Sequence, residues 1–412
     1  MKADLDRLMQ ERNLTAIVVT GDEGYSDVRD YMSNGAHITG GYIVKRVGDT
    51  PRLYVNGMEI EEARKSGYPC KTYGEVGYYE LAEAHGMAQA PLFFWERFLQ
   101  DAGVTEGRIG LYGVGNVNTY LELVKRLQAL FPQYEFVGEY DSPTLFQEAY
   151  LTKDANELAR IHDVARKTND VLALTWDYIA SHRADASETL IKRDGDPLTI
   201  GDVKRFVRIA LLERGLEDTG MIFAQGRDGG FPHSRGEEAQ ALRMGQAIVF
   251  DLFPRELGGG YHHDVTRTWS IGYATPEVQR AYDDVMTAFD IALETYAHRQ
   301  PAYRLQEAVQ SYFESKGHPT IRTTQNPTEG YVHSLGHGVG LNIHESPALH
   351  HLKKDDILEA GNFITIEPGL YYPEAGFGVR IEDSFIIRES GELISITPFK
   401  KDLILPLASQ EE

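Results

Sequence analysis

Hydrophobic residues recur at two alternating spacings along residues 1–150. Leu5, Leu8 and Met9 have helical spacing and precede the β-branched run at 16–19, which predicts a short helix followed by a strand. The same patterns predict a hairpin over 41–55, helices over 58–65 and 119–130, and strands over 108–112 and 134–137. Strand and helix patterns interleaved in this way favour an α/β domain.

A different pattern begins near residue 150, where a long helix is expected. Asp154 and Glu157 have the spacing of a capping box, in which two side chains satisfy the first turn of a helix. Apolar residues then recur at helical spacing from Leu158 to Thr175. We therefore predict one domain over 1–150 and a second over 151–412. Further helices are predicted near 202–214, 276–299 and 303–316, and strands over 221–224, 247–252, 266–271, 363–366, 378–381 and 384–387.

Five residues suited to a metal site lie in the second half of the chain, each within a short apolar or glycine-rich phrase. They are Asp251, Asp264, His337, Glu367 and Glu382. A single acid at a strand end is expected to be solvated, because Asp and Glu are mostly exposed. Glu367, however, follows the apolar run 363–366 and is expected to point inward, where a carboxylate needs a cation. Four carboxylates and one imidazole suit two divalent cations held side by side.

The spacing of the acids indicates how they come together. Asp251 ends one β-rich run and Asp264 precedes another, so a hairpin would place both carboxylates on one face. Glu367 and Glu382 repeat this arrangement, and His337 lies between two glycines, where the backbone can approach another segment closely. Calcium needs only oxygen ligands, and structural zinc prefers Cys and His. The set therefore suits Mn²⁺, Co²⁺ or Fe²⁺, with Zn²⁺ as a further candidate.

Composition disfavours several classes of function. The net charge of −21 argues against a nucleic-acid partner, because phosphate binding needs a basic surface. The single cysteine, Cys70, precludes a disulfide within one chain and fits a reducing compartment. The charged N-terminal stretch lacks the apolar core of a signal peptide, and no apolar run is long enough to span a membrane. We therefore expect a cytoplasmic protein without a membrane partner.

The phrases around the five residues resemble those of the pita-bread metallopeptidases, which include methionine aminopeptidases, Xaa-Pro aminopeptidases and prolidases. The resemblance covers essentially the whole chain and is carried by HSLGHGVG at 333–340, IEPG at 366–369 and RIED at 380–383. It implies an α/β (α+β) protein, with a creatinase-like N-terminal domain over 1–150 and a pita-bread catalytic domain over 151–412. Methionine aminopeptidases lack that N-terminal domain, so the Xaa-Pro branch fits better.

The resemblance implies a role for each of the five residues. Asp251 would be a terminal ligand of one metal ion, and Asp264 and Glu382 would bridge two ions. His337 and Glu367 would complete the ligands of the second ion. The expected cofactor is two divalent ions per chain, with Mn²⁺ preferred over Co²⁺, Zn²⁺ or Fe²⁺.

Other residues are implied to serve the substrate. His233 matches the histidine of the substrate pocket, and His344 matches the one that contacts the scissile carbonyl. Glu367 is the best placed group to carry a proton to the leaving nitrogen, and Arg380 would either contact substrate or pair with the site carboxylates. Residues implied to be catalytic are His233, His344, Glu367 and Arg380, and residues implied to surround the ligands are His333 and Tyr371.

The implied activity is hydrolysis of an Xaa-Pro bond in a small peptide with proline at the second position. The interval from Asp251 to Asp264 is longer than the commonest spacing of the family, and prolidase-like members share it, which favours an Xaa-Pro dipeptidase. An Xaa-Pro aminopeptidase acting on longer peptides is the main alternative. A dipeptidase needs a cation for the carboxylate of its substrate, and Arg380 would not decide the matter, because the aminopeptidases also have it. Phe231 is a candidate wall for the proline ring.

The sequence leaves two further functions open. One is a non-catalytic binding protein on the same fold, and the other is a creatinase-like hydrolase that needs no metal. The complete set of metal ligands disfavours both, although fold alone never fixes function. The resemblance also implies a homodimer.

Overall fold

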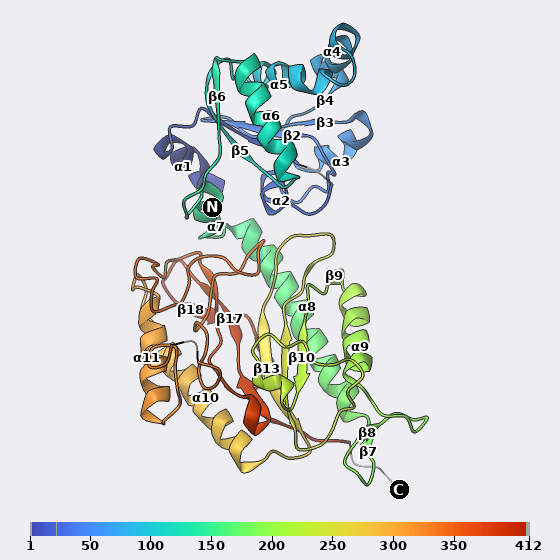
Figure 1. The fold of residues 1–412 in the computed structure, drawn as a ribbon, viewed down its shortest axis with the longest axis vertical. Coiled ribbons are helices and arrows are strands. Elements are labelled where there is room, and N and C mark those ends of the chain that lie inside the picture. Colours follow the sequence, from blue (N-terminus) through green and yellow to red (C-terminus); the bar gives the residue numbers. More distant parts are fainter. Residues whose placement is uncertain (1, 22, 326, 409–412) are drawn as a thin grey trace. The chain divides into compact units, whose positions relative to one another are not determined.

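The computed structural model describes residues 2–21, 23–325 and 327–408. The chain divides into two compact units, Met1–Tyr150 with Gly258–Gly260, and Leu151–Leu257 with Tyr261–Glu412. Figure 1 shows the elements of each unit. Within the described residues, no helix combines the length and apolar character needed to cross a bilayer.

The first unit is built on a six-stranded mixed sheet with the order β4-β3-β2-β1-β5-β6. Its strands are β1 (Ala16–Val19), β2 (Tyr42–Arg46), β3 (Arg52–Val55), β4 (Cys70–Thr72), β5 (Gly107–Tyr112) and β6 (Tyr134–Val137). Its α-helices are α1 (Leu5–Glu11), α2 (Asp27–Met32), α3 (Ile60–Arg64), α4 (Tyr78–His85), α5 (Ala90–Asp101), α6 (Val117–Leu130) and α7 (Leu145–Tyr150). An aromatic core that includes Tyr54, Trp95 and Phe98 holds α5 against the sheet.

The second unit contains two main sheets. The first has the order β10-β11-β13-β19, and the second has the order β14-β17-β18. The strands of these sheets are β10 (Ile222–Gln225), β11 (Ala247–Leu252), β13 (Val265–Ile271), β19 (Ile404–Leu405), β14 (Phe363–Ile366), β17 (Asp383–Ile387) and β18 (Leu393–Ser395). Three short pairs join β7 (Arg183–Ala184) with β8 (Leu190–Ile191), β9 (Leu216–Glu217) with β12 (Arg255–Glu256), and β15 (Gly369–Tyr372) with β16 (Phe377–Arg380).

Four helices cover these sheets from opposite sides (Figure 1). They are α8 (Ala155–Ala180), α9 (Ile200–Leu212), α10 (Pro276–Thr295) and α11 (Tyr303–Ser315). Helices α8 and α9 share a hydrophobic core with β10, β11 and β13. Helices α10 and α11 share a second core with β14, β16 and β17. The strands between the two cores are therefore almost wholly buried, and a polar side chain on them needs a specific partner.

The start of α8 follows from its sequence. The Asp154 carboxylate accepts hydrogen bonds from the amides of Asn156 and Glu157 over 2.9 and 3.0 Å. The Glu157 carboxylate accepts one from the Asp154 amide over 2.8 Å, which completes the predicted capping box. Ile161 and Leu172 lie on the buried face of the helix. The long helix predicted from residue 154 is thus present.

The predicted α/β (α+β) class is confirmed, and the differences lie at the ends of elements and in elements that were missed. Helix α10 ends at Thr295, short of the predicted 299, because Tyr296 adopts an extended backbone with ψ 133°. Helix α5 was missed, because its Phe93-Phe94-Trp95 run hides the helical spacing and Pro91 stands in its first turn. Strand β15 was missed because Pro368 and Gly369 suggest a turn.

Removal of the α8 cap tests whether local sequence stabilises this unit. Asp154→Ala deletes the acceptor of two amides, and we expect the free energy of unfolding to fall by about 1–2 kcal/mol. Urea unfolding followed by circular dichroism measures the change. Asp170→Ala, at an exposed position of the same helix, is the control and should change stability by less than about 0.5 kcal/mol. Equal losses in the two variants would contradict this account of the helix start.

Candidate metal centre

The pairing of β11 with β13 brings Asp251 and Asp264 together. Asp251 lies opposite Thr266 in this antiparallel ladder, and Asp264 precedes Thr266 by two residues, so both lie on one face. Thr266 also forms a bridge to Glu382, whose amide donates to the Thr266 carbonyl over 3.0 Å. The Thr266 hydroxyl donates to Glu382 Oε2 over 2.7 Å. Thr266 therefore links three of the four acids.

Glu367 and His337 come from the adjacent ladder. The register of β14 with β17 puts Glu367 opposite Glu382, one residue beyond the paired strands. On the other side of β14, the Thr365 amide donates to the His337 carbonyl over 2.8 Å. This approach needs glycine beside His337, because a Cβ on Gly336 would lie 2.1 Å from the Thr365 carbonyl oxygen. Neighbouring backbone segments thus carry all five residues to one place.

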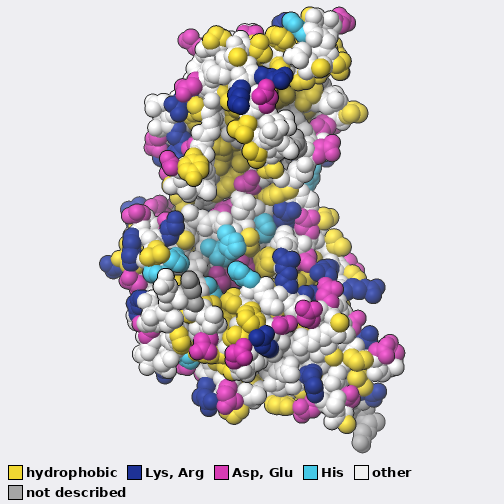
Figure 2. All heavy atoms as spheres, in the orientation of Figure 1, with side chains coloured by type: hydrophobic (Ala, Val, Ile, Leu, Met, Phe, Trp, Pro, Cys, Tyr) yellow, Lys and Arg dark blue, Asp and Glu magenta, His cyan; other side chains and the backbone are white. Residues whose placement is uncertain are grey.

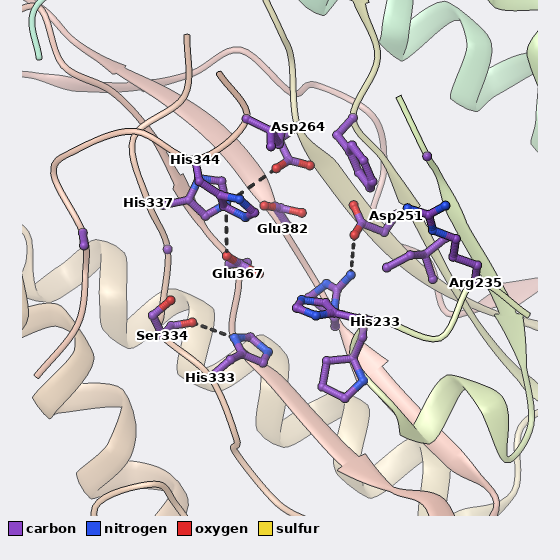
Figure 3. Close-up of a pocket in the computed structure, with 18 residues that line it drawn as sticks. His233, Arg235, Asp251, Asp264, His333, Ser334, His337, His344, Glu367 and Glu382 are labelled. Atoms are coloured by element: carbon purple, nitrogen blue, oxygen red, sulfur yellow. Dashed lines mark hydrogen bonds and ion pairs between the residues drawn. The ribbon is translucent and has the colours of Figure 1, made fainter. Parts of the chain in front are cut away.

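These side chains line a cavity of about 520 Å³. Figure 3 shows the 18 residues that surround it. Besides the five, they include His233, Arg235, Pro232, Ile222, Phe253, His333, Ser334, Ile343, His344, Ala348 and Arg380. His233 and His344 are exposed, and histidines also gather in one surface patch of the second unit in Figure 2. The structure therefore brings the sequence-predicted residues together, with Tyr371 behind the wall.

One predicted wall residue is placed elsewhere. Phe231 is 40% exposed, and the Arg227 Cζ atom lies 5.1 Å from the centroid of its ring. Phe231 is absent from the cavity lining. The prediction of Phe231 as a wall of the pocket is wrong, and Phe253 and Ile343 line the cavity instead. Arg235 also lines the cavity and was not predicted, although it follows His233 by only two positions.

Two of the acids lie beyond ordinary hydrogen-bond distance from the His337 ring. His337 Nε2 lies 3.7 Å from Asp264 Oδ2 and 3.5 Å from Glu367 Oε1. One ligand atom from each of Asp264, His337 and Glu382 lies within 4.8 Å of the others. Two ligands that share an ion at about 2.0–2.2 Å lie at most about 4.4 Å apart, and the separations of 3.7 and 3.5 Å satisfy this limit. His337 Nδ1 lies 2.9 Å from the Gly338 carbonyl and donates to it, so the lone pair of Nε2 faces the acids.

The acids also leave buried oxygens without hydrogen bonds. Among the described residues, Asp251 Oδ1, Asp264 Oδ1 and Glu382 Oε1 are buried and have no hydrogen-bond partner. Buried polar atoms are normally paired. Three unpaired carboxylate oxygens from residues that line one cavity with His337 fit divalent cations with oxygen and nitrogen ligands.

Crowding shifts the protonation of these groups. Burial, with repulsion from Asp251 and Glu367, raises the pKa of Asp264 well above its ordinary value. Burial and the neighbouring acids raise the pKa of Glu382 in the same way. Burial raises the pKa of Glu367 to about 8, against the opposing charge of Arg380. Without a cation, the acids therefore retain protons that metal binding would displace.

Arg380 is committed to the protein around the site. Its N–H groups donate to Asp251 Oδ2 (2.5 Å), Thr266 Oγ1 (3.0 Å), Tyr371 OH (2.8 Å) and the Pro232 carbonyl (3.3 Å). Tyr371 OH lies 2.9 Å from His333 Nε2, and His333 Nδ1 lies 2.7 Å from the Ser334 carbonyl. Burial lowers the pKa of His333 to about 3, so this ring is neutral and accepts from the Tyr371 hydroxyl.

Two exposed histidines, His344 and His233, lie at the cavity. The ring of His344 lies 4.5 Å from that of His337, with 69° between the planes. Burial and the neighbouring His233 lower the pKa of His344, so the ring is neutral at pH 7 and has one N–H to donate. His233 lines the cavity in the same view (Figure 3).

Comparison with known proteins places this geometry in a family. Residues 178–389 match the model of Metallopeptidase family M24, and the chain is 34% identical to the Xaa-Pro dipeptidase of Pyrococcus furiosus over 88% of each chain. The chain belongs to Metallopeptidase family M24. The resemblance inferred from the sequence motifs is therefore confirmed, and use of divalent metal by this family agrees with the carboxylate–histidine cluster.

Solved structures share the fold over nearly the whole chain. An Xaa-Pro dipeptidase from Bacillus anthracis is 21% identical, with a TM-score of 0.74 and coverage of 98% of this chain and 99% of that one. An X-Pro aminopeptidase from Thermotoga maritima is 20% identical, with a TM-score of 0.72 and the same coverage. Since both kinds of enzyme have this fold, the fold does not separate dipeptidase from aminopeptidase.

A buried ion pair anchors the segment that carries His344. Lys153 Nζ lies 2.8 Å from Glu345 Oε2, and the two side chains are 1% and 5% exposed. Glu345 Oε1 accepts from the Asn342 amide over 3.0 Å, and the backbone of Glu345 pairs with Gly338. The pair therefore connects the start of α8 with the segment between His337 and His344.

Removal of one charge of this pair should destabilise the protein more than removal of both. Lys153→Met leaves a buried carboxylate unpaired, and we expect a loss of about 3–5 kcal/mol in the free energy of unfolding. The double variant Lys153→Met/Glu345→Gln should lose less stability than Lys153→Met alone, because it leaves no buried charge without a partner. Urea unfolding of the four proteins measures the coupling, and additive losses would contradict it.

The raised carboxyl pKa values predict how the metal-free protein responds to pH. Glu367 holds its proton up to about pH 8 in the folded state and up to about pH 4.5 in the unfolded state. The folded state therefore binds more protons between these values, and its stability falls as pH rises through them. Thermal midpoints of chelator-treated protein at pH 5–8 test this, with Glu367→Gln as the control that should flatten the dependence. A wild-type midpoint that rises more steeply with pH than that of Glu367→Gln would contradict the prediction.

Proposed function

We propose that this metallopeptidase is a dinuclear Xaa-Pro dipeptidase. The observation that carries the proposal is the cavity with four carboxylates and one imidazole, in a chain 34% identical to an Xaa-Pro dipeptidase over 88% of each chain. The unpaired carboxylate oxygens support a metal-dependent enzyme over the non-catalytic and metal-independent alternatives.

Five residues would hold the ions. Asp251 would be a terminal ligand, Asp264 and Glu382 would bridge, and His337 and Glu367 would complete the second ion's ligands. The carboxylate-rich set favours Mn²⁺, with Co²⁺, Zn²⁺ and Fe²⁺ as alternatives. When bound, such ions supply a water of lowered pKa and polarise the scissile carbonyl.

The chain's own groups would position the substrate and move the proton. Neutral His344 donates its N–H to the oxygen of the scissile carbonyl as negative charge develops there. Glu367 accepts the proton of the attacking water and passes it to the proline nitrogen. Arg380 holds Asp251 and Tyr371 in place through the bonds described above, and His233 contacts the substrate at the cavity mouth. His333 keeps the Tyr371 hydroxyl oriented.

We also propose a cytoplasmic homodimer. The resemblance of the whole chain to the Xaa-Pro enzymes supports the dimer, and the lone Cys70 supports a reducing compartment. The net charge of −21 supports a small-peptide substrate over a nucleic acid.

Hydrolysis of two matched peptides tests the proposed activity. We expect the Mn²⁺-loaded protein to cleave Ala-Pro efficiently and Ala-Pro-Ala at least about 10-fold less well in kcat/KM, and Asp264→Asn to lose at least about 100-fold activity. Asp170→Asn, at an exposed position outside the cavity lining, is the matched control and should retain full activity. Efficient cleavage of Ala-Pro-Ala would instead assign an Xaa-Pro aminopeptidase. Failure of the loaded protein to cut either peptide would overturn the Xaa-Pro activity altogether.

A further inference from the structure

Two arginines line the metal cavity, and their surroundings differ. Arg380 is buried and donates to four acceptors of the protein. Arg235 is exposed, and among the residues that the structure describes its guanidinium has no hydrogen bond or ion pair. Arg235 therefore carries a charge at the cavity whose N–H groups are available to a ligand.

The backbone fixes the place of Arg235. A Cβ on Gly220 would lie 2.9 Å from Arg235 Nη2, so the guanidinium packs on the bare backbone of Gly220. Gly236, the next residue in the loop, lies against β10, because a Cβ there would be 2.2 Å from the Phe223 carbonyl oxygen. In Figure 3 Arg235 lies across the cavity from His337 and His344, with Asp251 between them. Arg235 therefore lies on the side of the cavity opposite these two histidines.

An apolar surface lies beside this cation. The β10–β11 ladder pairs Ile222 with Asp251, and the same register continued by two residues sets Gly220 opposite Phe253. Ile222 and Phe253 both line the cavity. The wall next to the Arg235 guanidinium is thus apolar, which suits a pyrrolidine ring.

We propose that Arg235 binds the C-terminal carboxylate of the dipeptide substrate and so selects dipeptides over longer peptides. This proposal rests on the dipeptidase function proposed above. A substrate carboxylate that leaves water for the cavity needs a cation to meet it, because an unpaired desolvated charge is costly, and arginine binds carboxylates through two parallel hydrogen bonds. Arg380 has committed its donors, which leaves Arg235 for this role. Ile222 and Phe253 would then contact the proline ring between the carboxylate and the scissile bond.

A longer peptide places an amide where a dipeptide has its carboxylate. The amide has no charge to pair with Arg235, and the chain beyond it must pass the guanidinium. An uncharged dipeptide amide isolates the first effect, because it differs from the dipeptide only in the group that Arg235 would bind.

The test is a cycle of two enzymes and two substrates, each Mn²⁺-loaded enzyme being assayed on Ala-Pro and on Ala-Pro amide. We expect Arg235→Gln to lower kcat/KM for Ala-Pro by about 10- to 100-fold, mainly through KM, and to change kcat/KM for the amide by less than about 3-fold. Arg235→Lys should recover part of the loss. Arg280→Gln, an exposed arginine outside the cavity lining, is the matched control and should change neither substrate.

The outcomes separate this proposal from the dipeptidase function. Equal losses on both substrates, or no loss on Ala-Pro with Arg235→Gln, would overturn the role of Arg235 while the dipeptidase activity stood. A wild-type protein that cuts the amide as well as it cuts Ala-Pro would also overturn that role. A loaded wild-type protein that does not cleave Ala-Pro would overturn both proposals.

Discussion

Repulsion among four carboxylates in one cavity is the constraint on which the rest of the site depends. Each acid sits on a backbone segment whose neighbours are fully buried, so none can escape to solvent by a side-chain rotation alone. Burial and this repulsion together raise the pKa of Asp264 well above its ordinary value, so bound protons relieve the repulsion in part. Divalent cations would relieve it more completely, because they also satisfy the oxygens that no donor reaches. The surrounding polar groups suit a bound cation. The His337 lone pair faces the acids, and the Arg380 guanidinium forms an ion pair with Asp251.

Much of the fold could be predicted from local pattern. Helix α8, with its Asp154 cap, and strand β11, with its run of apolar residues, are set by capping and periodicity. The start of α8 and both ends of β11 were predicted, whereas the predicted stripe of α8 stops at Thr175 and the helix continues to Ala180. Helix α5 and strand β15 were missed, because a dense aromatic run and a Pro-Gly pair obscure the spacing on which such predictions rest. Helix α5 is stabilised by the packing of Trp95 and Phe98 in the core of the first unit. Such packing cannot be read from a single sequence.

The site was predictable to the extent that motifs carry it. His337 and Glu382 stand in short motifs, and the structure brings them into one cavity as their family resemblance implies. The wall of the pocket was not predictable, since Phe231 and Phe253 have the same side chain and only the fold decides that Phe253 lines the cavity. Arg235 shows the same limit: its position beside His233 was visible, but its packing on Gly220 depends on a contact between distant segments. Metal ligands are limited to a few residue types and can therefore be recognised in a sequence. Any residue type can line a pocket, so the pocket wall is known only once the fold is known.

The number of Mn²⁺ ions that the chelator-treated chain binds tests the proposed metal site, and titration calorimetry with elemental analysis after gel filtration measures it. We expect two ions per chain for the wild type and fewer than two for a variant in which Asp264, the residue proposed to bridge the ions, is changed to asparagine. Absence of Mn²⁺ binding, or equal binding after this change, would rule out a dinuclear site at these carboxylates.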